Sequence, residues 1–238
     1  MTDFPNRELY ASLVYLADNL VADFDVVDLL NRLVSSSLSL LNVSAAGILL
    51  DDQRGSLRVL ASSSEETHML ELLELQGSGG PCRDALTTSS VIEVPNLDAA
   101  RDRWPEFVAA AEVLGIQAAY AVPLRLRETT IGALNLLCDD QTVLGPEDLE
   151  IARLLTNIAT IGIINHRLTS QQTLLAEQLQ SALNTRIVIE QAKGVIAERT
   201  GVDMAVAFEM LRTAARSSRR PLTEVAAEIA RGGTSAAI

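Results

Sequence analysis

Three arginines near the C-terminus, Arg212, Arg216 and Arg219, are spaced four and three residues apart, and Arg220 follows them directly. On an α-helix the first three positions fall within about 60° of one another, so their guanidinium groups would share one face. Guanidinium groups bind phosphate oxygens through paired hydrogen bonds, and they also stack on unpaired bases. This spacing therefore suits an anionic polymer such as a nucleic acid.

A second basic pair, Arg186 and Lys193, lies seven residues apart and would share a face of the preceding helix. Lys193 is the only lysine of the chain, and Gly194 follows it. A glycine inside a helix costs about 1 kcal/mol relative to alanine, so close approach by a partner is one reason for it. Two interpretations remain open at this point: a nucleic-acid surface, or a solvated basic face that Glu190 and Glu209 partly neutralise.

The charge distribution separates the two ends of the chain. The 238 residues carry a net charge of −12, which would repel a nucleic acid if it were spread evenly. Residues 1–170 hold 11 basic and 24 acidic side chains, whereas residues 171–238 hold 8 and 7. Because the second segment has a net charge of +1, only this segment could approach phosphates without electrostatic penalty.

Other candidate sites in the first segment have simpler explanations. The glycine-rich stretch 77–80 lacks the Gly-Lys-Ser or Gly-Lys-Thr that a phosphate-binding loop needs, so we expect a plain loop. Cys82 is either a redox-sensing thiol or a structural residue. The acidic pairs 51–52 and 139–140 lack the lysine of a phosphoacceptor site. With two cysteines and two histidines far apart, we find no metal-ligand cluster and no catalytic triad, so an enzyme is the least favoured class.

Hydrophobic periodicity predicts which elements position these residues. Helices are predicted over residues 7–22, 26–41, 65–75, 105–114, 146–199, 204–217 and 223–230. Strands are predicted over residues 46–50, 57–61, 91–94, 120–126 and 131–138, with turns at 51–55 and 127–129. Because hairpins rather than regular βαβ repeats connect the strands, we predict an α+β fold with an antiparallel sheet and flanking helices.

The last three helices are short enough to share one small core. We expect it to contain seven residues: Val195, Ile196, Phe208, Leu211, Leu222, Val225 and Ile229. In the long helix, residues 149–164 are expected to pack on their own domain. Residues 165–182 form either a coiled-coil dimer seam or a helix packed on its own domain, and these alternatives stay open. The seam would comprise Ile161, Leu168, Leu175, Leu179 and Ala182, with Asn165 and Gln172 as its polar members, and would end before Arg186.

No stretch of about 18 apolar residues occurs, so no membrane span is predicted. The N-terminal sequence MTDFPNREL has an early aspartate and no apolar run, which is not typical of a signal peptide. We therefore expect a soluble, cytoplasmic protein.

Residues 183–199, together with Ala207-Phe208, the stretch 211–216 and the stretch 222–226, resemble the ANTAR family in residue types and spacing. The resemblance implies a dimeric module that binds paired stem-loops in nascent transcripts and prevents transcription termination. The positions that it implies for RNA contact are Arg186, Lys193, Arg212 and Arg216. On electrostatic grounds we add Arg219 and Arg220.

Residues 10–165 resemble a GAF domain through a series of short matches in the family's order. These matches are Gly80-Pro81-Cys82, Trp104-Pro105, Ala121-Val122-Pro123-Leu124 and Ile131–Leu136. The resemblance implies a sensory domain with a small-molecule pocket between the sheet and the region 77–115, but it implies no particular ligand or cofactor. Cys82, Trp104 and Tyr120 are the candidate pocket residues.

The sequence therefore predicts a GAF-like sensory domain over residues 1–165, a linking helix over 166–182, and an ANTAR-like RNA-binding domain over 183–238. The predicted function is a ligand-responsive, homodimeric antitermination regulator without catalytic activity. The alternative is a dimeric signalling or protein-interaction module whose basic face is incidental.

Overall fold

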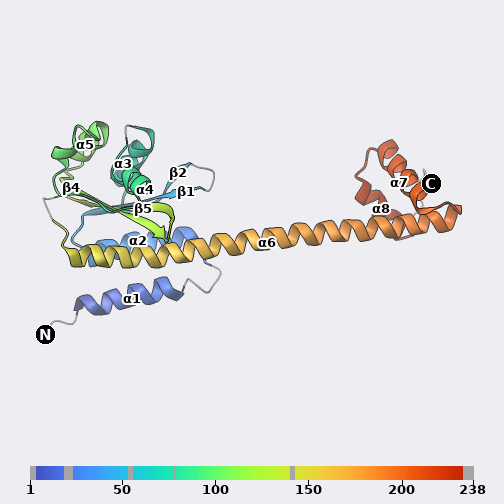
Figure 1. The fold of residues 1–238 in the computed structure, drawn as a ribbon, viewed down its shortest axis with the longest axis horizontal. Coiled ribbons are helices and arrows are strands. Elements are labelled where there is room, and N and C mark those ends of the chain that lie inside the picture. The colour runs from blue at the N-terminus through green and yellow to red at the C-terminus, as the bar shows by residue number, and fades with distance from the viewer. Residues whose placement is uncertain (1–3, 19–23, 53–55, 78, 140–142, 233–238) are drawn as a thin grey trace. The chain divides into compact units, whose positions relative to one another are not determined.

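The computed structural model describes residues 4–18, 24–52, 56–77, 79–139 and 143–232. The chain divides into two compact units, residues 1–168 and residues 169–238. The first unit contains a β-sheet covered by helices, and the second unit is helical (Figure 1).

A five-stranded antiparallel sheet forms the centre of the first unit. Its strands are β1 (Ala45–Asp51), β2 (Leu57–Ser62), β3 (Ile92–Val94), β4 (Ala118–Leu126) and β5 (Thr129–Cys138). They lie in the order β2-β1-β5-β4-β3. The tight β4–β5 turn places Arg127 at a positive φ of 55°. The predicted α+β fold is confirmed, whereas residues 53–55 of the predicted β1–β2 turn lie outside the described residues.

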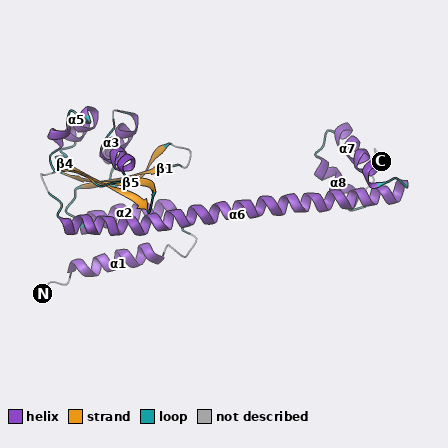
Figure 2. Ribbon diagram, in the orientation of Figure 1, coloured by secondary structure: helices purple, strands orange, loops and turns teal. Residues whose placement is uncertain are grey.

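Helices cover both faces of this sheet (Figure 2). One face carries α2 (Val26–Leu40) and the beginning of α6 (Pro146–Thr200), and α1 (Phe4–Asp18) packs against α2. The other face carries α3 (Glu65–Gln76), α4 (Pro81–Thr88), α5 (Pro105–Val113) and the short 3-10 helix η1 (Leu97–Ala100). Because side chains alternate along a strand, β4 directs Tyr120 and Val122 toward α2 and α6, and directs Ala119 and Ala121 toward the opposite helices.

Local capping explains where several helices begin. Asp25 accepts a hydrogen bond from the Val27 backbone N–H at the start of α2, and Ser64 accepts one from the Thr67 N–H in α3. Helix α4 was not predicted, because its eight residues contain two threonines and show no clear apolar period. Pro81 opens it at a position where a missing N–H costs nothing.

Three helices form the second unit: the C-terminal part of α6, α7 (Met204–Ser218) and α8 (Leu222–Ala230). Asp203 caps α7 by accepting hydrogen bonds from two backbone N–H groups, and Arg219 ends it in the left-handed conformation. The buried core includes Ile196, Leu211, Val225 and Ile229, as predicted, with half-buried Val195 and Leu222 packed against it. Phe208 was predicted in this core but is only half-buried. Instead, Ala207 and Leu211, which lie one helical turn apart, are buried in this core.

Helix α6 changes character along its length. Leu149, Leu155 and Ile163 are buried against the sheet of the first unit, so the prediction that this segment packs on its own domain is confirmed. In contrast, every residue from 168 to 184 is exposed. None of the described helices is both long and apolar enough to cross a membrane.

Candidate nucleic-acid interface

The arginines of α7 converge on one open hollow. Arg212 and Arg216 on the helix, and Arg219 and Arg220 just beyond it, line a hollow of about 350 Å³ together with Ala215 and Leu222. Arg219 adopts a positive φ of 53°, and this turn allows Arg220 to remain beside the helix that has just ended. The structure thus brings together four of the six predicted contact residues.

Phe208 joins this group to helix α6. The Nζ atom of Lys193 lies 5.7 Å from the centroid of the Phe208 ring, and the Cζ atom of Arg212 lies 5.8 Å from it. Both cations are within the range of favourable cation–π contact. Sequence reasoning assigned Phe208 to the core and missed this role. Its position one turn before Arg212 signals the contact with that arginine, but the contact with Lys193 depends on how α7 packs on α6.

Carboxylates accompany several of these cations. Lys193 binds Glu190 at 2.8 Å, and Arg212 binds Glu209 at 2.8 Å. Arg220 binds Glu228 at 2.7 Å, and this hydrogen bond is the main cause that raises the pKa of Arg220. Among the described residues, no carboxylate pairs with Arg216 or Arg219. The ion pairs of Arg212 and Arg220 are exposed and contribute little to stability, so a phosphate can replace their carboxylates.

The remaining two predicted residues differ from this group and from each other. Lys193 keeps only 16% of its side chain exposed, because it lies between Glu190 and Phe208. Arg186 is exposed on α6, about 10 Å along the helix axis from Lys193, and is not among the residues that line the hollow.

The three predicted pocket residues of the first unit lie in three separate apolar clusters. Trp104 packs edge-on against Phe107, with ring centroids 6.4 Å apart, and Cys82 of α4 packs against Ala121 of the sheet. Tyr120 points to the opposite side of the sheet, where its hydroxyl accepts a hydrogen bond from the Leu144 N–H. Alternation along β4 therefore separates Tyr120 from the other two, and the structure does not bring the three residues together.

The family model described as GAF domain matches residues 25–163, and the model described as ANTAR domain matches residues 177–229. The chain belongs to the GAF domain family and carries a C-terminal ANTAR domain. Both are regulatory domains. A comparison with curated proteins gave no significant match.

Solved structures share the fold of the GAF domain. A domain of a two-component sensor histidine kinase from Sinorhizobium meliloti is 18% identical with a TM-score of 0.54, covering 63% of this chain and 99% of its own. A GAF domain from an Acinetobacter phosphoenolpyruvate-protein phosphotransferase is 13% identical with a TM-score of 0.52, covering 70% and 97%. The free methionine-R-sulfoxide reductase from Neisseria meningitidis is 17% identical with a TM-score of 0.52, covering 71% and 95%.

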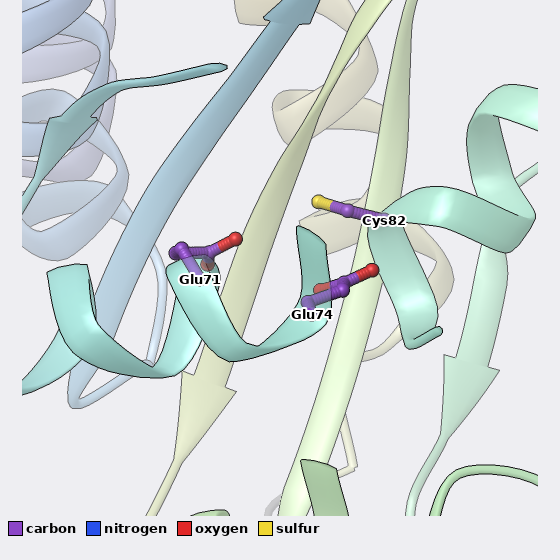
Figure 3. A group of neighbouring side chains, drawn as sticks. All are labelled: Glu71, Glu74 and Cys82. Atoms are coloured by element: carbon purple, nitrogen blue, oxygen red, sulfur yellow. The ribbon is translucent and has the colours of Figure 1, made fainter. Parts of the chain in front are cut away.

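The GAF domain also buries a cluster of ionisable residues that sequence reasoning missed. Glu71 and Glu74 of α3 lie beside Cys82 of α4, and all three are fully buried (Figure 3). Burial raises the pKa of Glu74 to about 7, and it raises the pKa of Glu71 and of Cys82 well above their usual ranges. The i, i+3 spacing of the two glutamates was the available signal, but on an exposed face the same spacing is unremarkable.

Proposed function

We propose that this protein is a ligand-responsive RNA-binding regulator whose ANTAR domain binds stem-loops in nascent transcripts and prevents transcription termination. The observation that carries the proposal is the shared hollow of Arg212, Arg216, Arg219 and Arg220. Four guanidinium groups around one hollow match the closely spaced phosphates of a folded RNA loop, and the half-buried Phe208 ring beside Arg212 offers an apolar surface to a base.

A salt titration with a labelled two-stem-loop transcript tests this proposal. Affinity should fall steeply with salt, by roughly 0.7 log units per phosphate contact for each tenfold increase in concentration. Arg216→Ala should weaken binding about tenfold at low salt and reduce the salt slope by one contact.

Arg231→Ala is the matched control. Arg231 is exposed at the end of α8 and does not line the hollow, so its loss removes the same charge from the same domain. If the two variants bind RNA equally well, the hollow is not the RNA site.

We further propose that the protein is a homodimer that associates through helix α6. Leu175, Leu179, Leu183 and Ile187 follow one another at four-residue steps, and each is between 53% and 58% exposed. This stripe shares Leu175 and Leu179 with the seam expected from the sequence, but it continues past Arg186, where that seam was expected to end. Four large apolar side chains on a solvent-exposed helix are costly in a monomer, and burying the exposed half of each one yields roughly 1 kcal/mol.

This stripe also favours the second candidate function, a dimeric interaction module without RNA binding. Sedimentation of the wild type and of Leu179→Asp separates the candidates when it is combined with the RNA titration. A dimer that dissociates in Leu179→Asp, together with RNA binding that depends on Arg216, supports the regulator. A dimer that does not bind stem-loop RNA at low salt supports the interaction module.

Ligand control would act as a population shift. A small molecule bound by the GAF domain can change RNA binding only if it has different affinities for two states of the protein. The measurement is RNA affinity with and without a metabolite that raises the melting temperature of the GAF domain. Equal RNA affinity in both conditions would remove ligand control from the proposal.

A further inference from the structure

Two carboxylates and a thiol meet inside the GAF domain (Figure 3). Glu71 and Glu74 project from α3, and Cys82 projects from the first turn of α4. One oxygen of each carboxylate and the Cys82 Sγ all lie within 4.8 Å of one another. None of the three side chains reaches solvent. Potential ligand atoms from two helices are therefore gathered in one enclosed space.

Two glycines make room for the carboxylates. A Cβ atom on Gly47 of β1 would lie 2.5 Å from a Glu71 carboxylate oxygen. A Cβ atom on Gly80, just before α4, would lie 2.5 Å from the carboxylate carbon of Glu74. Any larger residue at either position would push the carboxylate away, so the backbone on two sides is shaped around the acidic groups.

Asn135 of β5 supplies an independent sign that a ligand belongs here. Its Nδ2 donates hydrogen bonds of 2.9 and 3.0 Å to the two oxygens of Glu71, and one of 3.1 Å to Glu74. Its Oδ1 is buried and has no hydrogen-bond partner. A half-turn of the amide exchanges the two atoms and would direct Oδ1 at the carboxylate oxygens, where either a proton on a glutamate or a bound metal ion would have to lie between them.

Within the described residues, no lysine, arginine or histidine side chain contacts either carboxylate. Glu74 accepts a hydrogen bond from the Arg83 backbone N–H at 2.7 Å, and thereby caps α4, whereas Glu71 has only Asn135. Two buried carboxylates without a basic partner require protons or a metal ion for neutralisation.

We propose that Glu71, Glu74, Cys82 and the Oδ1 of Asn135 bind one divalent transition-metal ion of the zinc class. One thiolate with three oxygen ligands suits zinc, whereas magnesium and calcium prefer oxygen ligands alone. In a tetrahedral zinc site the ligand atoms lie about 3.5 Å apart, because Zn–O and Zn–S bonds are about 2.0 and 2.3 Å long. The side chains therefore need to move inward by about 1 Å. Binding displaces the Cys82 proton, together with any protons carried by Glu71 and Glu74, into solvent.

Such an ion would connect α3, α4 and β5 at one point. Its binding would stabilise the folded GAF domain, because the unfolded chain does not hold these four residues together. The site belongs to the GAF domain alone, so its existence does not depend on RNA binding.

The test uses the full-length protein, stripped with a chelator and titrated with Zn²⁺ and with Co²⁺. We expect one ion per chain, a rise of about 5 °C or more in the melting temperature with Zn²⁺, and proton release on binding. Co²⁺ should give a thiolate charge-transfer band in the near ultraviolet. Saturation with Co²⁺ without this band overturns the proposal.

Cys138→Ser is the matched control, because Cys138 is the only other cysteine and is also buried. The charge-transfer band should survive in Cys138→Ser and disappear in Cys82→Ser. Survival in Cys138→Ser assigns the thiolate to Cys82 even if Cys82→Ser does not fold. Glu71→Gln should weaken Zn²⁺ binding about tenfold or more. Wild-type affinity in Glu71→Gln, or loss of the band in a folded Cys138→Ser, contradicts the site.

Discussion

The GAF and ANTAR domains place their charged side chains in opposite surroundings. In the GAF domain, Glu71 and Glu74 are fully buried, and burial is the main cause that raises both pKa values. In the ANTAR domain, Arg212 keeps 40% of its side chain exposed, and Glu209 beside it is more exposed still. Ionisable side chains therefore affect folding stability strongly in the GAF domain and only weakly in the ANTAR domain.

Solvent access explains this difference. Water screens an exposed ion pair, so Arg212 can exchange Glu209 for another anion at little cost. Water cannot reach the buried acids, so every hydrogen bond to them matters for folding. The stability of the GAF domain should therefore be sensitive to the loss of one hydrogen-bond donor in its buried cluster. Substitutions in the arginine cluster of the ANTAR domain should instead change mainly the affinity for RNA.

Asn135→Ala should give the largest effect. The substitution leaves two buried carboxylates without their shared donor, so the free energy of unfolding of the GAF domain should fall by about 3 kcal/mol. Urea unfolding of the chelator-treated protein measures this. Asn157→Ala, at an exposed position of α6, is the control and should stay within about 0.5 kcal/mol of the wild type. If Asn135→Ala lowers the free energy of unfolding by less than about 1 kcal/mol, the buried cluster is no more important for stability than the exposed one.

Gly132→Ala should have the next largest effect. A Cβ atom at this position of β5 would overlap the backbone oxygen of Leu49 on β1, and backbone in the centre of a sheet cannot move aside. We expect a loss of about 2 kcal/mol or more in the same urea experiment. Gly145→Ala meets only ordinary contact, at 3.5 Å from an Asp148 oxygen, and serves as the control. Equal stability of the two variants would contradict the close strand approach.

Gly194→Ala should act in the opposite direction on stability. A Cβ atom at Gly194 would meet nothing within 4 Å, so alanine should stabilise helix α6 by about 0.5–1 kcal/mol. If RNA approaches closely beside Lys193, the same variant should bind the stem-loop transcript less tightly. Thermal unfolding and RNA titration measure the two effects separately. Unchanged RNA affinity would mean that Gly194 does not face the RNA.

Glu209→Gln should give the smallest effect, and in favour of binding. Removing this carboxylate frees Arg212 for phosphate, so RNA affinity should rise two- to threefold at low salt, and the gain should vanish at high salt. Glu112→Gln removes an equivalent carboxylate from Arg101 in the GAF domain and should leave RNA affinity unchanged. A gain of the same size in both variants would indicate a general charge effect rather than release of Arg212.

Much of the fold was predictable from local patterns. Asp25 and Asp203 each stand directly before a helix and accept hydrogen bonds from its first backbone N–H groups, which is a preference of the residue type itself. The alternation through Tyr120 and Val122 correctly predicted strand β4. Helix α4 escaped prediction because Gly80-Pro81 is typical of a loop, and its N-terminus is capped by Glu74 from another helix rather than by a neighbour in sequence.

The candidate sites were predictable only in part. The four-residue spacing of Arg212 and Arg216 was sufficient to place both on one face, because a single helix determines that geometry. Arg219 lies just beyond the helix and reaches the same hollow through its left-handed backbone conformation rather than through helical spacing. The spacing could not reveal that Phe208 stays half-exposed between Arg212 and Lys193, since this depends on how α7 packs on α6. The grouping of Tyr120 with Cys82 failed for a related reason: motif order along the chain does not say which face of a sheet a side chain occupies.

By itself, the sequence determined the type and order of most elements, the division of charge between the domains and the shared face of Arg212 and Arg216 on α7. The elements and this face depend on residues a few positions apart, and the charge division depends on composition alone. Only the tertiary structure decided that Glu71, Glu74, Cys82 and Asn135 share one buried space. Their meeting depends on how α3, α4 and β5 pack together, and packing across distant segments leaves no periodic trace along the chain.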